Sequence, residues 1–171
     1  MNTIIIGGCR SGKSARALSE AENFNPRRRL FIATCRPCDD EMRTRIARHQ
    51  RERDPRWETL EVPLELPATL AAHNTRGNVI LVDCLTLWIT NLMLAERSGA
   101  EIESQIAALV DAMSVMRCPV ILVANEVGQG IVPENRMARR FRDWAGMVNQ
   151  KVAACADQVI WMVAGIPVKI K

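Results

Sequence analysis

The fold of this chain is decided by the stretch Thr3-Ile4-Ile5-Ile6-Gly7-Gly8-Cys9-Arg10-Ser11-Gly12-Lys13-Ser14. Its first four residues are β-branched, which favours a strand, and two glycines interrupt that strand. From Ser14 to Glu22 the residues Ala17, Leu18 and Ala21 fall on one side of a helix. The stretch therefore predicts a strand, a glycine turn and a helix, in that order.

The glycine turn matches the pattern G-x-x-x-x-G-K-[ST] at every fixed position and has the strand and helix that the pattern requires. In such a loop the main-chain N–H groups point at phosphate oxygens, Lys13 adds positive charge at the outer phosphates, and Ser14 offers a hydroxyl to Mg²⁺. The alternative is a turn with a chance lysine, but the context favours nucleotide binding. The predicted nucleotide-binding residues of the loop are Gly7, Gly8, Cys9, Arg10, Ser11, Gly12, Lys13 and Ser14.

A second candidate metal ligand is Asp83, which ends the predicted strand Asn78 to Asp83. Proteins with this kind of loop carry at such a position the acidic residue that helps to hold Mg²⁺, usually through water. By itself, an aspartate at the end of a strand is an ordinary turn residue. Together with the phosphate loop, it predicts a metal site formed by Ser14 and Asp83.

Strands and helices alternate along the rest of the chain, which predicts an α/β fold with a mostly parallel, doubly wound sheet. Combined with the phosphate loop, this indicates a P-loop NTPase-type, RecA-like, three-layer fold, and the length of 171 residues suits one domain spanning residues 1–171. The further predicted strands are Leu30–Thr34, Val120–Asn125 and Val159–Val163, with an edge strand around Trp57–Val62. The further predicted helices are Leu85–Leu94, Glu101–Met116 and, as one helix or two, Pro133–Ala156.

Composition indicates a soluble globular protein, with 48% apolar and 25% charged residues. No apolar run approaches the roughly 20 residues of a membrane-spanning helix, and no signal peptide is evident, so we expect a cytoplasmic protein. The six cysteines are expected to be mostly small buried hydrophobic residues. The net charge of +4 is concentrated in Arg27–Arg29 and in six arginines between Arg43 and Arg56, which suits a local anionic partner such as a nucleotide or a nucleic acid.

His49 lies in a helix predicted to run from Asp39 to about Arg53, where it shares one face with Met42 and Ile46. A neutral imidazole can attack a phosphorus atom, and the arginines of this helix could steady a phosphate, so His49 could be a nucleophile or a general acid or base. The same placement fits a partly buried structural histidine, and the residues alone favour that interpretation.

The pair Cys35 and Cys38 forms a C-x-x-C motif between a predicted strand and a predicted helix, as in thioredoxin-like thiol pairs. A single pair cannot form a four-thiolate zinc site, and the phosphate loop already accounts for this fold. A structural role is therefore favoured over redox chemistry. His73, at a probable helix end, has less to suggest a function.

Beyond these motifs, the chain resembles the family of bifunctional adenosylcobinamide kinases / adenosylcobinamide-phosphate guanylyltransferases of cobalamin biosynthesis. The resemblance runs from Ile4 to Lys171 and includes the phosphate loop, Asp39-Asp40-Glu41-Met42 and His49. It also includes Phe141-Arg142-Asp143, Asn149-Gln150, Val168-Lys169-Ile170-Lys171 and, most specifically, Asn125-Glu126-Val127-Gly128-Gln129-Gly130-Ile131-Val132-Pro133-Glu134-Asn135-Arg136.

This resemblance implies two reactions. The first is phosphorylation of the aminopropanol hydroxyl of adenosylcobinamide by ATP or GTP. The second is transfer of GMP from GTP to the resulting phosphate, through a guanylylated histidine, to give adenosylcobinamide-GDP and pyrophosphate. The family's histidine motif matches Arg45-Ile46-Ala47-Arg48-His49, so the resemblance assigns the nucleophile to His49, against the structural interpretation above.

The family's nucleotide contacts carry over by position to Gly7 through Ser14 and to Thr34, Cys35, Arg36, Gln50, Arg51, Glu52, Arg53, Glu61 and Asp83. Mg²⁺ and Lys13 would offset the charge of the leaving pyrophosphate, and the resemblance also implies a homotrimer. Cys9 and Cys35 stand where alanine or serine is commoner, and Pro167 interrupts a tail motif that contains glycine. None of these departures removes a chemical group that the mechanism requires.

Other classes of P-loop protein remain as alternatives. A GTP-driven switch should carry an N/T-K-x-D motif after a strand, and Asn125-Glu126-Val127-Gly128 does not match it. A RecA-like nucleic-acid-dependent ATPase and a small-molecule kinase without the guanylyl step share the features of this sequence more closely. With the resemblance included, we expect adenosylcobinamide and its phosphate as partners, and no nucleic acid.

Overall fold

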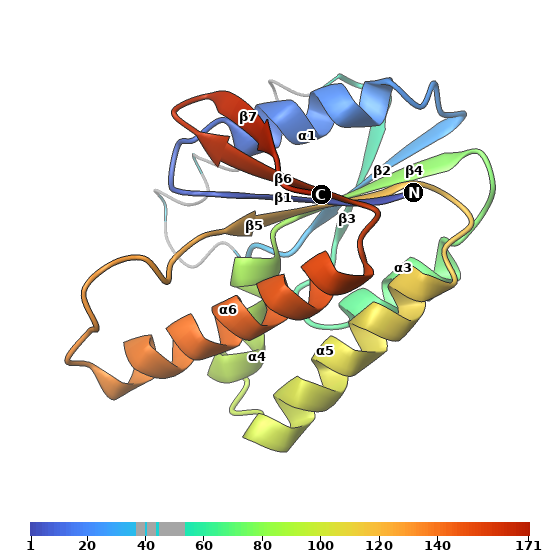
Figure 1. Ribbon diagram of the computed structural model, residues 1–171. Helices are drawn as coiled ribbons and strands as arrows, with labels where there is room; N and C mark the ends of the chain where they lie inside the picture. The colour runs from blue at the N-terminus through green and yellow to red at the C-terminus, as the bar shows by residue number, and fades with distance from the viewer. Residues whose placement is uncertain (37–39, 41–43, 45–53) are drawn as a thin grey trace.

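A computed structural model describes residues 1–36, 40, 44 and 54–171 and contains one sheet of seven strands (Figure 1). Of the predicted helix that carries His49, the structure describes only Asp40 and Thr44, so His49 itself lies outside the described residues. Across the sheet the strands follow the order β3-β2-β4-β5-β1-β6-β7. They are β1 (Asn2–Gly7), β2 (Arg28–Ala33), β3 (Trp57–Glu61), β4 (Asn78–Asp83), β5 (Val120–Asn125), β6 (Gln158–Val163) and β7 (Ile166–Lys169).

The sheet is parallel from β3 to β6, and only the last pair, β6 and β7, is antiparallel. In the parallel part the carboxyl ends of the strands meet at one edge. Gly7 pairs with Asn125 of β5. Ala33 of β2 pairs with both Asp83 of β4 and Glu61 of β3. The register therefore gathers the predicted site residues of four strands along one edge.

Helices cover both faces of the sheet (Figure 1). On one face lies α1 (Lys13–Glu22), and on the other lie α3 (Leu66–Ala72), α4 (Leu85–Leu94), α5 (Gly99–Ser114) and α6 (Arg136–Cys155). Helices on both sides of a mostly parallel sheet make the three-layer arrangement that the alternation of strands and helices predicts. The prediction of an α/β fold with this sheet is confirmed.

The core consists of two apolar clusters, one on each face of the sheet. Because side chains alternate along a strand, Ile4 and Ile80 join the cluster under α3 to α6, while Ile5 and Leu81 join the cluster under α1. The first five residues of β4 and of β5 are all buried, as expected for strands covered on both faces. These two central strands give the carboxyl edge a rigid base.

The chain departs from the sequence prediction mainly near its end. Strand β7 was not predicted; it pairs with β6 through a turn in which Ala164 and Gly165 have φ angles of 50° and 85°. Helix α6 is one continuous helix that begins at Arg136 rather than at Pro133. The Asn135 side chain caps it by accepting a hydrogen bond from the N–H of Ala138 at 3.1 Å.

One expectation drawn from composition is corrected. Among the described cysteines, Cys84 and Cys118 are buried, whereas Cys35 and Cys155 are half-buried and Cys9 is exposed; Cys38 lies outside the described residues. In the arginine run at the start of β2, Arg28 pairs with Glu58 and Arg29 pairs with Glu22. Across the described ranges of the chain, none of the helices has the length and apolar character needed to span a membrane.

Candidate active site

The phosphate loop connects the end of β1 at Gly7 to the start of α1 at Lys13. Gly7 leaves no room for a side chain, because a Cβ atom there would lie 2.6 Å from the carbonyl oxygen of Met162 and 2.7 Å from Ser11 Oγ. Gly12 has a φ of 91°, a left-handed conformation that L side chains rarely adopt. The two fixed glycines of the motif are therefore explained by close packing at Gly7 and by backbone conformation at Gly12.

Neighbouring segments hold the loop from both sides. On the β5 side, the N–H of Glu126 donates to the Gly7 carbonyl at 3.0 Å. On the β6 side, the N–H of Gly165, in the turn to β7, donates to the Ser11 carbonyl at 3.2 Å. The β6–β7 hairpin, whose second strand was not predicted from the sequence, therefore supports the phosphate loop.

The positive groups of the loop converge on its concave side. Lys13 is buried, and its Nζ donates to the Gly8 carbonyl at 2.5 Å and lies 3.5 Å from Ser11 Oγ. Helix α1 begins at the same residue, and no side chain caps its first turn, so its N-terminal amides and its dipole face the loop. An ammonium group and a helix N-terminus at one point form an anion-binding site.

Ser14 and Asp83, the predicted metal ligands, lie in contact although they come from α1 and from the end of β4. Ser14 Oγ donates to Asp83 Oδ2 at 2.9 Å. A hydroxyl oxygen and a carboxylate oxygen beside a phosphate site are donors of the kind that Mg²⁺ prefers. The two residues present therefore fit a magnesium ion.

Thr34, which follows β2, is fully buried and joins the ends of two strands. Its Oγ1 donates to the carbonyl of Cys84 at 2.7 Å and accepts from the N–H of Cys84 at 2.8 Å. Its carbonyl accepts from Asn91 Nδ2 at 2.7 Å. These hydrogen bonds link the end of β2 to Cys84, the residue after Asp83, and to α4. Thr34 therefore helps to position the backbone next to Asp83.

The remaining predicted contacts lie farther along the same edge or outside the described residues. Cys35 is half-buried and Arg36 is exposed, directly after Thr34, and Glu61 is exposed at the end of β3. The predicted nucleophile His49 and the contacts Gln50, Arg51, Glu52 and Arg53 lie outside the described residues.

Sequence reasoning assigned no role to Glu126, although it quoted the segment that contains it. Glu126 is half-buried at the end of β5, which lies between β1 and β4. It borders a cavity of about 310 Å³ that is lined by Gly8, Cys9, Arg10, Ser11, Glu126, Gln129, Trp161, Met162, Val163 and Ala164. The useful signal was its position: Glu126 follows the apolar run 120–124 and Asn125, at the carboxyl edge of the sheet where the phosphate loop also lies.

Arg142 of α6 fixes the segment 126–135 that follows β5. Its Nη2 donates to the carbonyl of Gly128 at 2.6 Å and to that of Gly130 at 3.3 Å, and its Nη1 donates to that of Ile131 at 2.9 Å. One side chain therefore bonds to three carbonyl groups of the segment. A second residue of α6, Asn149, donates from Nδ2 to the Asn125 carbonyl at 3.1 Å.

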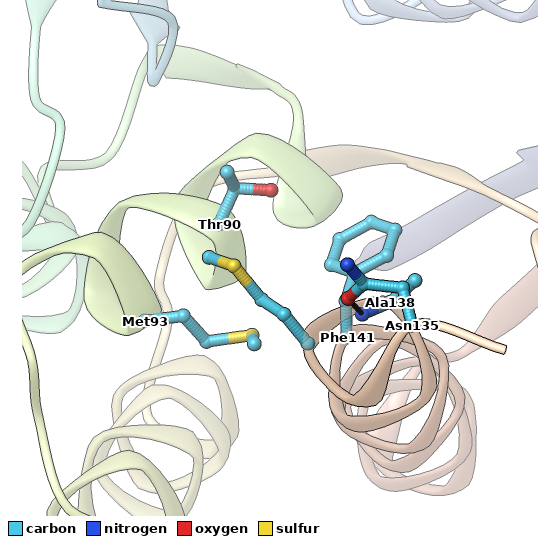
Figure 2. Close-up of a pocket in the computed structure, with 6 residues that line it drawn as sticks. Thr90, Met93, Asn135, Ala138 and Phe141 are labelled. Atoms are coloured by element: carbon cyan, nitrogen blue, oxygen red, sulfur yellow. Dashed lines mark hydrogen bonds between the residues drawn. The ribbon is translucent and has the colours of Figure 1, made fainter. Parts of the chain in front are cut away.

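Figure 2 shows a second cavity, of about 390 Å³, between α4 and the start of α6. The side chain of Met93 and the ring of Phe141 face this space, which is bordered by Asn135 at the helix cap. Its lining residues are Thr90, Met93, Asn135, Met137, Ala138 and Phe141. None of them carries an ionisable side chain, so this space has none of the groups of the phosphate site.

Comparison with known proteins identifies one family over nearly the whole chain. The family described as cobinamide kinase / cobinamide phosphate guanyltransferase matches residues 3–170. The chain is 43% identical over its full length to the bifunctional adenosylcobalamin biosynthesis protein CobU of Salmonella typhimurium, and the alignment covers all of that protein. It is also 40% identical over its full length to the bifunctional adenosylcobalamin biosynthesis protein CobP of Pseudomonas aeruginosa, of which 98% is covered.

Solved structures that resemble the chain share its fold at low sequence identity. The flagellar accessory protein FlaH from Methanocaldococcus jannaschii aligns with 99% of this chain and 77% of its own, with a TM-score of 0.56 and 14% identity. The RadB recombinase aligns with 94% of this chain and 73% of its own, with a TM-score of 0.52 and 17% identity. These likenesses bear out the RecA-like arrangement of the sheet.

Proposed function

This chain belongs to the cobinamide kinase / cobinamide phosphate guanyltransferase family, and we propose that it catalyses both reactions in that name. It phosphorylates adenosylcobinamide with ATP or GTP, and it then transfers GMP from GTP to adenosylcobinamide phosphate. The observation that carries the proposal is the phosphate loop with a buried Lys13 and the Ser14–Asp83 contact, within a chain that matches the family from residue 3 to residue 170.

In the kinase reaction, an oxygen of the aminopropanol hydroxyl bonds to the γ-phosphorus of the nucleotide as the bond to the nucleoside diphosphate breaks. The loop from Gly7 to Ser14 binds the phosphates through its N–H groups. Lys13 offsets charge at the outer phosphates, where negative charge builds on the leaving oxygen. The convergence of Lys13 Nζ and the uncapped start of α1 on the loop supports these roles.

In the guanylyl transfer, we assign the nucleophile to His49, on the match of Arg45 to His49 with the family motif. A ring nitrogen bonds to the α-phosphorus of GTP and pyrophosphate leaves. An oxygen of adenosylcobinamide phosphate then bonds to the same phosphorus as the P–N bond breaks. Two displacements divide one difficult transfer into two steps, each with a good leaving group.

Ser14 and Asp83 are the residues we propose to hold Mg²⁺. A bound magnesium ion would neutralise phosphate charge and orient the phosphates for attack. The 2.9 Å bond between Ser14 Oγ and Asp83 Oδ2 supports this assignment, because it puts two oxygen donors at one point beside Lys13. Thr34 keeps Asp83 in position through its two hydrogen bonds to Cys84.

The proposal also includes further nucleotide contacts, an oligomeric state and a location in the cell. Cys35, Arg36 and Glu61 bind nucleotide along the carboxyl edge of the sheet, together with the segment from Gln50 to Arg53. The chain works as one domain within a homotrimer in the cytoplasm and binds no nucleic acid.

The test follows each phosphate separately. The protein is incubated with Mg²⁺, adenosylcobinamide and GTP labelled in either the γ- or the α-phosphate. We expect γ-label on the corrinoid first and α-label on it later, with an acid-labile α-label on the wild-type protein that His49→Ala abolishes. Transfer of γ-label without α-label would mean that the protein has only the kinase activity. An α-label on the protein that survives in His49→Ala would exclude His49 as the nucleophile.

A further inference from the structure

Glu126 lies at the junction of the phosphate loop and the sheet. Its N–H donates to the carbonyl of Gly7, the first residue of the loop, at 3.0 Å. Strand β5, which it follows, is hydrogen-bonded to β1 on one side and to β4, with Asp83, on the other. The main chain of Glu126 is therefore fixed between the phosphate loop and the carboxylate proposed to hold the metal.

The carboxylate of Glu126 is oriented by one hydrogen bond and borders open space. Oε1 accepts from the N–H of Gly128 at 2.7 Å, and the side chain borders the 310 Å³ cavity formed with Gly8 to Ser11. Within residues 1–36, 40, 44 and 54–171, no cationic side chain forms an ion pair with it. One oxygen is thus held in place, and neither forms an ion pair in this part of the chain, although Arg10 lines the same cavity.

The hydrogen bond that orients Glu126 is itself supported. Arg142 donates to the carbonyl of Gly128 at 2.6 Å, so the peptide group next to the orienting N–H is anchored to α6. A side chain at Gly128 would bring its Cβ to 3.0 Å from Glu126 Oε1, a close approach that glycine avoids. The arrangement Arg142, Gly128, Glu126 fixes a carboxylate beside the loop proposed to hold the outer phosphates.

We infer that Glu126 is the general base of the kinase reaction and accepts the proton of the substrate hydroxyl. As the hydroxyl oxygen bonds to the γ-phosphorus, its O–H bond breaks and the proton moves to the carboxylate, while the nucleoside diphosphate leaves with the electrons of the broken P–O bond. This inference rests on the proposed function. Arg142 is then a positioning residue, acting through the segment 128–131.

The chemistry of the two reactions predicts a selective effect. The nucleophile of the kinase step is a hydroxyl, which has to lose a proton. The nucleophile of the final guanylyl transfer is a phosphate oxygen, which is already anionic and needs no base. Loss of the Glu126 carboxylate should therefore slow the kinase reaction much more than the guanylyl transfer.

The first test compares Glu126→Gln with the wild type and with Glu134→Gln, a matched change at an exposed position of the same segment. Glutamine can still accept the hydrogen bond from Gly128, so the segment keeps its support. We expect kcat of the kinase reaction to fall roughly 10²-fold in Glu126→Gln, with the KM for ATP changing far less, and to stay within twofold in Glu134→Gln. A kinase kcat within threefold of wild type in Glu126→Gln would overturn the inference.

A second test distinguishes a role of Glu126 as general base from a role as structural support of the loop. Formate added to Glu126→Ala should restore part of the kinase rate, because a small carboxylate can occupy the vacated space, and it should leave the wild-type rate unchanged. Equal losses of both reactions, or no response to formate, would overturn the role as base and leave only a support of the loop. A wild-type protein with no kinase activity would refute the proposed function itself. Results on the Glu126 variants bear only on the role of Glu126.

Discussion

The phosphate loop and the segment 126–135 lie at the same edge of the sheet and are both rich in glycine, yet they are held in different ways. The loop combines a short-range bond from Lys13 to Gly8, five residues away, with main-chain bonds from Glu126 and Gly165. The segment is held by Arg142, whose bonds reach 11 to 14 residues back along the chain. The conformation of the loop depends mainly on the glycines and the lysine of its own motif. The conformation of the segment depends on a side chain of helix α6.

This difference predicts how each region fails. A change within the loop should damage every reaction that uses a triphosphate, because both proposed reactions bind their nucleotide there. A change at the support of the segment should leave nucleotide binding largely intact and affect the reaction that depends on Glu126. The four predictions below run from the largest expected effect to the smallest.

Lys13→Ala should lower the rates of both the kinase reaction and the guanylyl transfer by roughly 10³-fold, since removing one preorganised positive group from a transition-state site costs about 10²- to 10³-fold. The matched control is Lys151→Ala, at an exposed position of α6. Steady-state assays of both reactions provide the measurement. A loss confined to one reaction would show that the two do not share the loop.

Arg142→Ala should lower the kinase rate roughly 10-fold, because small misplacements of a catalytic group are costly in rate. Arg142→Lys should recover only part of it, since an ammonium group cannot reproduce the planar fork of the guanidinium that bonds to three carbonyls. Arg140→Ala, at an exposed position of α6, is the control. If Arg142→Ala weakened GTP binding as much as Lys13→Ala, the contrast between the two regions would disappear.

Gly7→Ala and Gly8→Ala compare a tightly packed position of the loop with an open one. A Cβ at Gly7 would lie 2.6 Å from a main-chain oxygen, whereas a Cβ at Gly8 meets nothing within 4 Å. We expect Gly7→Ala to lose about 1–3 kcal/mol of stability, and Gly8→Ala to melt near the wild-type temperature. Thermal unfolding measures both, and equal melting temperatures would contradict the close packing described at Gly7.

Arg56→Ala removes a charge at the opposite edge of the sheet and should affect neither region. Hydrogen bonds from Arg56 hold the pKa of Asp54 at about 2, below its usual 3.8. The stabilisation from Asp54 is therefore complete above pH 3.8 and is lost as the pH falls towards 2. In Arg56→Ala an NMR titration should show the Asp54 pKa raised from about 2 towards 3.8, with the main-chain hydrogen bond from residue 56 retained and both activities within twofold of wild type. A larger loss of activity would mean that a change at the amino ends of the strands alters the nucleotide site at their carboxyl ends.

The same contrast explains what could be predicted from the sequence. The strands β1 to β6 were predicted, because local patterns set strands. The parallel register then brings Ser14 and Asp83, predicted as metal ligands, into contact. Strand β7 was missed, since Pro167 and the short tail obscure a strand that pairs only with β6. The contacts of Arg142 could not be predicted either, because the main-chain carbonyls that it bonds carry no residue-specific signal in the sequence.

The central claim is that the loop from Gly7 to Ser14 binds the triphosphate with Lys13 at its outer phosphates. A crystal structure of the protein with Mg²⁺ and a non-hydrolysable β,γ-imido analogue of GTP tests it most directly. We predict that the β- and γ-phosphate oxygens lie within hydrogen-bonding distance of the loop N–H groups and of Lys13 Nζ, with the metal ion at Ser14. A nucleotide bound elsewhere on the chain, with the loop making no phosphate contact, would contradict the account.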